Sequence, residues 1–283
     1  MASFTNFATL SYNGGTTNSN IVTGEILEAL TAVKTAVSAN YSAGDRITYA
    51  LSLVNTGTAA ITDYTVTDNL GGYTVGANTV YPLAYNAGTV RYYINGVLQT
   101  APTVTAGPPL TVTGLTVPAG GSAVLIYETT ATPVAPLATG SSITNTATIT
   151  GGGLTNPITA QATVETATSA DLTISKALSP TTVTENGQIT YTFVISNTGN
   201  TEATATGNVV VTDTFAPILR NIAVTYNGTA WTDGTNYTYN AATGVFTTLA
   251  GQITVPAATF TQNTDGTFTV TPGTATLVIT GTV

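Results

Sequence analysis

The feature that most constrains this chain is an internal repeat of a strand-forming motif. Residues 44–57 (GDRITYALSLVNTG) recur as residues 187–199 (GQITYTFVISNTG). The sole two lysines, Lys34 and Lys176, stand 142 residues apart and precede the two copies by a similar distance. Repetition at this period indicates two copies of one domain, and a chain of 283 residues is long enough to give each copy its own core.

Each copy reads as a series of half-buried β-strands. Apolar residues alternate with polar ones in the repeated motif, as at Ile47, Tyr49 and Leu51, and turn residues such as Asn-Gly and Gly-Gly separate the segments. Residues 24–34 fit an amphipathic helix as well, but their repeat partner, residues 162–176, is rich in Thr and β-branched residues, which favours a strand. We therefore expect an all-β protein of two tandem immunoglobulin-like β-sandwich domains.

The two copies differ at their last strand. Residues 142–150 (SITNTATIT) form a final alternating strand in the first copy, whereas the second copy has no such strand after residues 275–282. Residues 3–11 (SFTNFATLS) reproduce that strand in order and in apolar phase. We predict a permuted repeat: an N-terminal donor hairpin in residues 1–28, a first sandwich in 29–168, and a second sandwich in 169–283 that lacks its final strand.

An open sandwich needs a strand from elsewhere, because exposed core and unpaired edges favour aggregation. The hairpin either completes its own second domain or that of a neighbouring copy, and we favour the neighbour because the hairpin runs directly into the first domain. The inward residues of the donor strand would be Phe4, Asn6, Ala8 and Leu10. A heterologous head-to-tail contact of this kind generates a filament.

Composition argues against most other functions. The chain has neither His nor Cys, which excludes disulfides, thiolate metal sites and the common catalytic triads, so we expect no cofactor, no metal and no enzyme activity beyond self-modification. The net charge of −8 disfavours binding to nucleic acid. Membrane insertion is also not expected, because no window of the sequence is long and apolar enough to span a bilayer.

Three polar residues in the first copy share the phase of the core residues around them. They are Lys34, Asp68 and Asn145. The corresponding residues of the second copy are Lys176 and Asp213, and the counterpart of the asparagine is Asn6 in the hairpin. Polar groups in a core are costly unless they satisfy one another.

Two interpretations of these residues remain open. One is a buried Lys–Asp ion pair with a hydrogen-bonded Asn. The other is a self-formed isopeptide bond, in which a neutral lysine amine attacks the asparagine carbonyl and ammonia leaves. Burial favours this chemistry, since it favours a neutral amine beside a protonated acid that polarises the amide. Asn55 and Asn197 share the inward phase too, but each begins an Asn-Thr-Gly turn, which we expect it to order.

The run DLTISK ending at Lys176, followed by residues 187–199 and by VVVTDT ending at Thr214, resembles the bacterial conserved repeat domain of unknown function number eleven. The likeness covers nearly the whole chain. It implies immunoglobulin-like domains in tandem on surface proteins, with Lys–Asn isopeptide bonds in several members. On this resemblance Lys34, Asp68 and Asn145 form one triad within the first domain, with Asp68 catalytic. Lys176, Asp213 and Asn6 form another across two chains, with Asp213 catalytic.

A two-domain subunit of this size is also similar to proteins of clostridial spore appendages. We accordingly expect an extracellular structural fibre on a cell or spore surface, either a pilus or a spore appendage. Its main partner would be copies of itself, with other surface or spore-coat proteins as further partners. The alternative is an adhesin or carbohydrate-binding module that uses the tyrosine-rich loops of residues 81–93 and 231–239.

Overall fold

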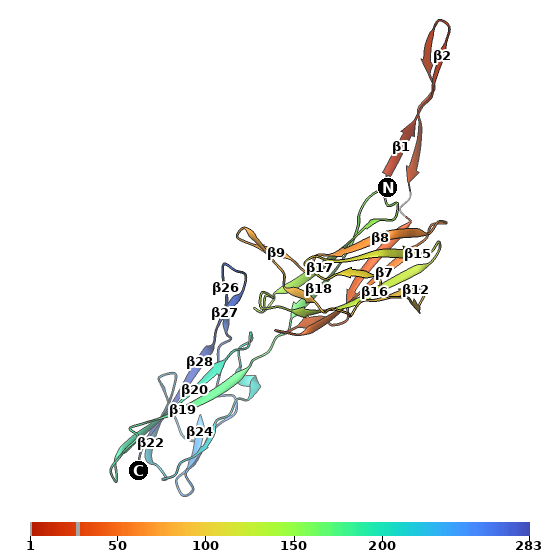
Figure 1. Ribbon diagram of the computed structural model, residues 1–283. Helices are drawn as coiled ribbons and strands as arrows, with labels where there is room; N and C mark the ends of the chain where they lie inside the picture. The colour runs from red at the N-terminus through yellow and green to blue at the C-terminus, as the bar shows by residue number, and fades with distance from the viewer. Residues whose placement is uncertain (1, 27–28) are drawn as a thin grey trace. The chain divides into compact units, whose positions relative to one another are not determined.

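The computed structural model describes residues 2–26 and 29–283 as two compact units (Figure 1). Unit 1 contains the residues up to 135 together with 142–165. Unit 2 contains residues 136–141 and 166–283. The described residues form β-strands and one short 3₁₀ turn and no α-helix, so the predicted all-β class is confirmed.

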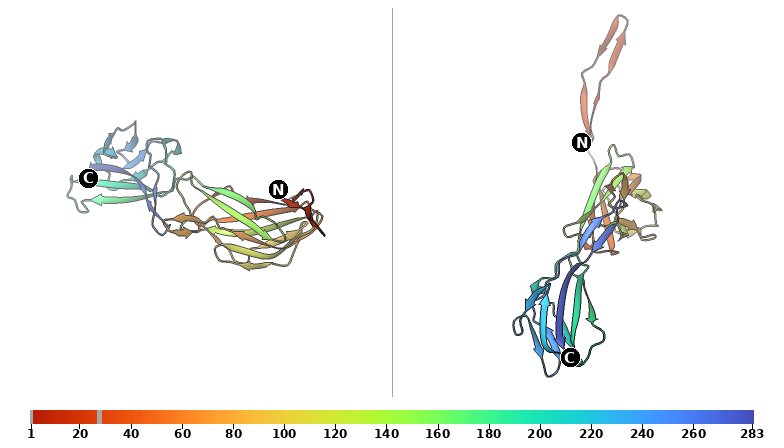
Figure 2. Two further views of the ribbon diagram at one scale, coloured as in Figure 1. Left: turned by 90° about the horizontal axis from the view of Figure 1, so that it is seen from above. Right: turned by 90° about the vertical axis from the view of Figure 1, so that its left-hand side faces the viewer.

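Unit 1 is a sandwich of two six-stranded sheets with antiparallel pairing, seen from two further directions in Figure 2. The first sheet has the order β13 (Val97–Leu98), β12 (Arg91–Ile94), β16 (Ser122–Ala131), β7 (Arg46–Asn55), β5 (Leu30–Ala36), with β11 (Leu83–Tyr85) also on β16. The second sheet has the order β14 (Thr103–Thr105), β15 (Leu110–Val117), β8 (Ile61–Asp68), β17 (Ser142–Gly151), β18 (Ile158–Thr166), β6 (Asn40–Tyr41). A separate small hairpin joins β9 (Tyr73–Val75) to β10 (Asn78–Val80).

Alternation along the strands builds the core of unit 1. In β7 the residues Ile47, Tyr49, Leu51 and Leu53 are fully buried, while Ser52 between them is exposed. Strand β16 pairs with β7 over nearly its whole length and buries every second residue in the same way. The core therefore lies between the two sheets, as the period of two in the sequence predicts.

Unit 2 repeats this plan with fewer strands. Its larger sheet has the order β19 (Leu172–Ser179), β20 (Gln188–Asn197), β28 (Gly273–Thr282), β22 (Arg220–Tyr226), β23 (Thr229–Trp231). Its second sheet has the order β21 (Thr212–Thr214), β25 (Val245–Thr248), β24 (Tyr237–Asn240). The remaining elements are the hairpin of β26 (Thr259–Gln262) and β27 (Phe268–Thr271) and the turn η1 (Ala205–Gly207).

Within the described residues, the second sheet of unit 2 lacks a partner strand at an edge where the second sheet of unit 1 has one. In unit 1, β8 lies between β15 and β17. The corresponding strand of unit 2, β21, pairs with β25 on one side, and no strand among residues 172–283 pairs with its other edge. As a result every residue of β19 after Leu172 is exposed, whereas β5 buries both Leu30 and Lys34.

Residues 2–26 form two short strand pairs. Strand β1 (Ala2–Asn6) pairs with β4 (Val22–Ile26), and β2 (Thr9–Tyr12) pairs with β3 (Gly15–Asn18). Among the described residues these four strands pair with one another alone. We call residues 2–26 the N-terminal hairpin.

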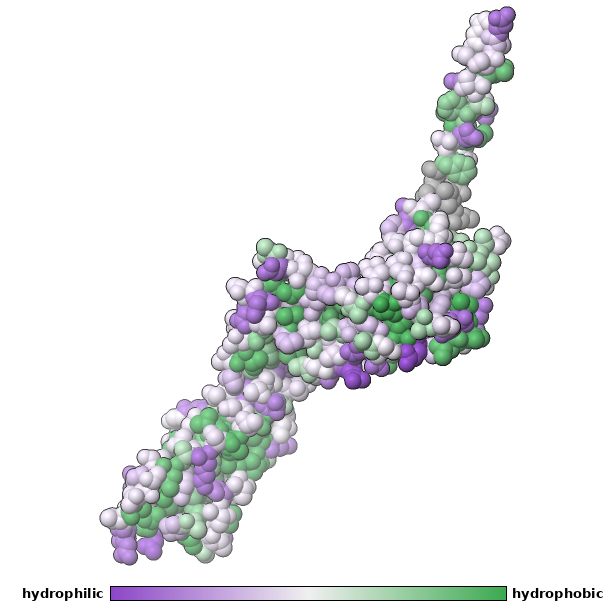
Figure 3. All heavy atoms as spheres, in the orientation of Figure 1, coloured by the Kyte–Doolittle hydropathy of each residue, from purple (hydrophilic) through white to green (hydrophobic). Residues whose placement is uncertain are grey.

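The N-terminal hairpin exposes large apolar side chains, which Figure 3 shows as hydrophobic surface. They are Phe4, Phe7, Leu10, Tyr12, Ile21 and Val22. An isolated two-stranded ribbon with an uncovered apolar face is marginally stable in water. Residues 24–34, for which helix and strand both fitted the sequence, contribute to β4 and β5, and Leu27 and Glu28 lie outside the described residues. No helix among the described residues has the length and apolarity needed to cross a membrane.

Candidate functional site

Lys34 projects from the edge strand β5 into the core of unit 1. It lies opposite Leu51 of β7, and its alternation with Leu30 turns it to the buried side of the sheet. The residue is 4% exposed. The inward orientation predicted from its phase is therefore the one that the structure has.

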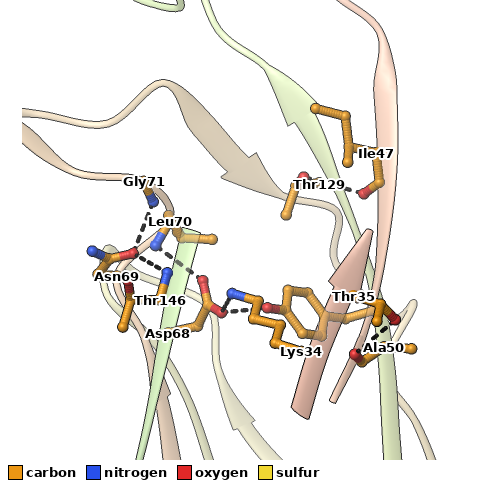
Figure 4. Close-up of polar contacts among 11 residues, drawn as sticks. Lys34, Thr35, Ile47, Ala50, Asp68, Asn69, Leu70, Gly71, Thr129 and Thr146 are labelled. Atoms are coloured by element: carbon orange, nitrogen blue, oxygen red, sulfur yellow. Dashed lines mark hydrogen bonds and ion pairs between the residues drawn. The ribbon is translucent and has the colours of Figure 1, made fainter. Parts of the chain in front are cut away.

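Asp68 meets Lys34 from the opposite sheet (Figure 4). It ends β8, it is 1% exposed, and its Oδ2 accepts a hydrogen bond from Lys34 Nζ at 2.5 Å. The hydroxyl of Tyr127 donates to the same oxygen, and the Leu70 N–H donates to Oδ1 at 3.0 Å. The carboxylate is thus held by three donors in a site closed to solvent.

Asn145 is the third buried polar residue of this region. It lies on β17 and is fully buried, two residues from Ala147, which pairs directly with Asp68. Alternation places Asn145, Ala147 and Asp68 on the same face of the second sheet. Lys34, Asp68 and Asn145 are therefore gathered between the sheets, and we call them the Lys34 site.

The amide of Asn145 has no hydrogen-bond partner at either its oxygen or its nitrogen. The hydroxyl of Tyr49, also buried, has none either, and across the described residues the remaining such atom is Nδ2 of Asn86. A buried polar group without a partner costs about 1–3 kcal/mol. The unsatisfied polar atoms of the protein are thus concentrated at one residue of the Lys34 site and one tyrosine beside it.

Burial sets the protonation of the groups around Asn145. It lowers the pKa of Lys34 from 10.5 to about 8, although the Asp68 charge and hydrogen bond oppose that shift. It raises the pKa of Tyr49 above its usual range, with the nearby Asn145 amide acting in the opposite direction. Burial likewise raises the pKa of Tyr127, and the Asp68 charge adds to this effect. Both tyrosines accordingly keep their hydroxyl protons, while the lysine loses its proton more easily than a solvated lysine does.

The corresponding site of unit 2 is half open. Lys176 Nζ donates to Asp213 Oδ2 at 2.5 Å, but the two side chains are 40% and 19% exposed. The ammonium lies 4.4 Å from the centroid of the Tyr191 ring and 5.4 Å from that of Phe193. This Lys176 site has the same ion pair as the Lys34 site and aromatic rings beside the lysine, but its lysine and aspartate are not buried.

The predicted donor residues all lie exposed on the N-terminal hairpin. They are Phe4, Asn6, Ala8 and Leu10. Asn6 pairs with Val22 across the ribbon. The partnership of Asn6 with Lys176 of another chain stays a prediction.

The register of β1 with β4 repeats that of β17 with β18. Ser3 pairs with Glu25 and Asn6 with Val22, whereas Ser142 pairs with Glu165 and Asn145 with Ala162. These paired positions are three residues apart on every strand involved. The N-terminal hairpin thus already has the pairing that its counterpart has inside a closed sandwich.

Sequence reasoning did not place the two tyrosines at the Lys34 site. Tyr49 and Tyr127 pair directly across β7 and β16, and their ring centroids are 5.8 Å apart. Their inward phase was a signal that could have suggested a position in the core. The prediction for Asn55 is confirmed, because its Oδ1 accepts from the Gly57 N–H at 2.9 Å and its Nδ2 donates to Ala59 O at 2.8 Å.

Over residues 2–26 and 29–283, no three His, Cys, Asp or Glu side chains come close enough together to hold a metal ion. The aromatic loop of residues 231–239 is built into unit 2. Trp231 stacks on Tyr226 with centroids 4.8 Å apart, Tyr237 is 5% exposed, and the Tyr239 hydroxyl donates to a backbone carbonyl at 2.7 Å. These contacts stabilise the sandwich, while Trp231 and Tyr239 remain partly exposed.

Comparison with known proteins finds no family model and no curated protein that matches the chain. Among solved structures it is similar to the major pilin subunit of Bacillus cereus, with 14% identity and a TM-score of 0.36 over 96% of this chain and 73% of that one. It is also similar to the pilus backbone of Streptococcus pneumoniae, with 14% identity and a TM-score of 0.36 over 86% of this chain and 55% of that one. A collagen-binding domain from a Staphylococcus aureus adhesin shares 11% identity at a TM-score of 0.31, over 49% of this chain and 99% of that one.

Proposed function

We propose that this chain is a structural subunit of an extracellular fibre, in which each copy completes unit 2 of the next copy with its N-terminal hairpin. The observation that carries the proposal is the match between β1–β4 and β17–β18 in register, together with the free edge of β21. In this proposal the hairpin supplies to unit 2 the strand pair that β17 and β18 form in unit 1.

The repeat predicts how the donor docks. In unit 1, Ala147 pairs with Asp68 and follows Asn145 by two residues. In the donor, Ala8 follows Asn6 by two residues in the same way. Ala8 of the donor therefore pairs with Asp213 of the acceptor, and β4 extends the sheet beyond β1. This docking adds two antiparallel strands to an open sheet, which is the usual mode of strand addition.

Apolar burial drives the contact. The acceptor exposes Ile174 by 55% and Leu178 by 38%, and the donor exposes Leu10 by 63% and Val22 by 55%. Burying a side chain of this kind stabilises a contact by about 1.5–3 kcal/mol. Assembly removes from water the same surfaces that would otherwise promote disordered aggregation.

Within unit 1 we assign Lys34 and Asn145 to an isopeptide bond. The neutral Lys34 amine attacks Cγ of Asn145, and the carboxyl group of Asp68 relays the proton that the amine gives up to the leaving amide nitrogen. A new C–N bond forms, the bond from Cγ to Nδ2 breaks, and ammonia leaves carrying that proton. The unsatisfied amide of Asn145 and the lowered pKa of Lys34 support this assignment over a resting ion pair.

The two tyrosines have distinct places in this reaction. Tyr127 donates to Asp68 and so orients the carboxyl group toward Lys34. Tyr49 has a buried hydroxyl without a partner, and the side chain of Asn145, whose oxygen is also unpaired, is close enough to act on its pKa. A donor held in a water-free site stabilises the negative charge that develops on a carbonyl oxygen under attack, and we assign this role to Tyr49.

In unit 2 we assign the equivalent bond to Lys176 and Asn6 of the neighbouring copy. Lys176 is half exposed in the free subunit, so its amine stays solvated and unreactive. Docking of the hairpin brings Asn6 and excludes water at once, after which Asp213 serves as the acid. The product is a fibre linked covalently from copy to copy without cysteine.

The test of this function is a denaturing gel of assembled protein after boiling in detergent. The unaltered chain should give a ladder of covalent multimers, and a protease digest should contain a branched peptide joining the Asn6 and Lys176 regions. Lys176→Ala and Asn6→Ala should each convert the ladder to single chains, while Asn145→Ala serves as a control that keeps it. A ladder that survives both of the first substitutions would refute the intermolecular bond.

A further inference from the structure

Unit 2 contains a cavity of about 640 Å³ at one end of its open sandwich. Its lining includes the apolar residues Leu178, Ile189, Tyr191, Ala216, Pro217 and Val283. We infer that this cavity is the receptor site for the Phe4 side chain of the neighbouring copy, and that Phe4 anchors the donor strand in register before the covalent bond forms. This inference rests on the proposed head-to-tail assembly and identifies the side chain that directs it.

Unit 1 shows which residue belongs at this place. Gly71 follows Asp68 by three positions, as Ala216 follows Asp213. A Cβ atom added at Gly71 would lie 2.6 Å from Cγ2 of Ile143, so the side chain of Ile143 rests against this turn. Ile143 is 2% exposed and is the counterpart of Phe4 in the donor strand. The cavity beside Ala216 therefore lies where unit 1 holds an apolar side chain of β17.

The donor and the receptor differ from unit 1 in complementary ways. Position 71 has no room for a methyl group, yet unit 2 carries Ala216 there and a large cavity next to it. On the donor, Phe4 pairs with Gly24, whereas Ile143 pairs with the fully buried Val164. The Phe4–Gly24 pair contains the same number of side-chain carbon atoms as the Ile143–Val164 pair. The extra volume of the Phe4 ring is therefore offset by the lack of a side chain at Gly24. Volume-conserving exchanges of this kind keep a core packed.

Phe4 is poised for this role in the free subunit. Its ring lies directly over Gly24, where an added Cβ would stand 2.4 Å from Cζ of Phe4, and the residue is 54% exposed. Phe7, three residues further on, is exposed to a similar extent, 55%, but has the opposite strand parity. Strand addition therefore points Phe4 into the acceptor and Phe7 away from it.

Filling the cavity also prepares the chemistry next to it. Tyr191 lines the cavity, and the same ring lies 4.4 Å from Nζ of Lys176. Asn6 follows Phe4 by two residues on the same face of β1. Once the ring is seated, Asn6 is therefore delivered to the Lys176 site, and the solvent that reaches the lysine through the open end is displaced.

Full-length chains with Phe4→Ala and Phe7→Ala provide a matched test, because both residues are exposed phenylalanines of one segment. The rate of covalent ladder formation is followed on denaturing gels at several subunit concentrations, with Trp231 fluorescence as a check that unit 2 is folded. Phe4→Ala should slow joining by about 100-fold at low concentration, as expected for truncation of a core aromatic residue, and Phe7→Ala should leave the rate within about threefold.

A second variant fills the cavity from the acceptor side. Ala216→Leu should slow joining with an unaltered donor, and the double variant Ala216→Leu with Phe4→Ala should join faster than Ala216→Leu alone. Equal rates for Phe4→Ala and Phe7→Ala would overturn the anchor and leave head-to-tail assembly intact. If the unaltered chain forms neither ladders nor filaments, both the anchor and the proposed function are overturned.

Discussion

Replacing Asn145 by leucine distinguishes a cross-linked core from one that is merely ion-paired. Leucine has the size and branching of asparagine but cannot form an isopeptide bond. Without a bond in the native protein, the substitution removes an amide whose two polar atoms are buried and unpaired. With a bond, it removes the covalent link between β5 and β17.

The two cases differ in the sign of the stability change. A link from residue 34 to residue 145 closes a loop of 111 residues, and its loss costs about 5 kcal/mol through the freedom of the unfolded chain. Burial of leucine recovers about 1.5–3 kcal/mol, so we expect unit 1 to be less stable by about 2–3.5 kcal/mol. In an unlinked protein the same substitution relieves unpaired polar atoms and stabilises unit 1 by about 1–3 kcal/mol.

Differential scanning calorimetry and intact mass measure this prediction together. The melting transition of unit 1 should fall by about 10 °C, given about 2–4 °C for each kcal/mol in a domain of this size. The mass of the unaltered chain should be lower than its sequence mass by one ammonia for each bond. The Asn145→Leu chain should not show the ammonia loss of unit 1 when its mass is compared with the mass of its own sequence. Trp231 is the single tryptophan and lies in unit 2, so its fluorescence during heating identifies the unit 2 transition, which should not move.

Asn6→Leu is the matched control, since Asn6 is the repeat counterpart of Asn145 but lies exposed on the N-terminal hairpin. In monomeric protein it should leave the unit 1 transition unchanged. A rise in the melting temperature of Asn145→Leu, together with a full-length mass in the unaltered chain, would refute the bond and leave the ion pair as the correct interpretation.

Two further predictions concern the reaction itself, followed by mass in chains synthesised cell-free, collected in urea and refolded by dilution. Burial lowers the pKa of Lys34 to about 8, so the fraction of neutral amine rises with pH up to about pH 8 and levels off above it. The rate of ammonia loss should follow this fraction, and a rate that stays constant as the pH rises toward about 8 would refute attack by the neutral amine. Tyr49→Phe should slow ammonia loss by about 10²–10³-fold without unfolding unit 1, and Tyr64→Phe, which alters another buried tyrosine, should not; equal rates would remove Tyr49 from the mechanism.

The sequence predicted the parts of the fold that depend on local period. Alternation in β5, β8 and β17 is enough to turn Lys34, Asp68 and Asn145 inward, because side chains two residues apart share a face. The repeat itself indicated that the hairpin resembles a closing strand pair. The Asn-Thr-Gly motif predicted the side-chain hydrogen bonds of the turn at Asn55, since they lie within the motif and its neighbours.

Other features depend on how the sheets pack, which no local pattern contains. Tyr127 reaches Asp68 from a strand of the opposite sheet, and the sequence does not say which inward side chains meet across a sandwich. The unpaired state of the Asn145 amide depends in the same way on the exact spacing of the two layers. The cavity beside Ala216 was equally hidden, because it results from the openness of unit 2 and not from any motif.

The positions of the bonded residues along the chain determine how a fibre of these subunits responds to tension. With both proposed bonds in place, force enters each subunit at Asn6 and leaves at Lys176. The Lys34–Asn145 bond carries this force directly, so the chain between residues 34 and 145 bears none of it. The stretches that can lengthen are residues 6–34 and 145–176, separations of 28 and 31 residues. All residues after Lys176 lie off the load-bearing path, so most of unit 2 could unfold without extending the fibre. Such a fibre would stretch by unzipping the N-terminal hairpin and by peeling β17 and β18, most of which lie between Asn145 and Lys176, away from unit 1.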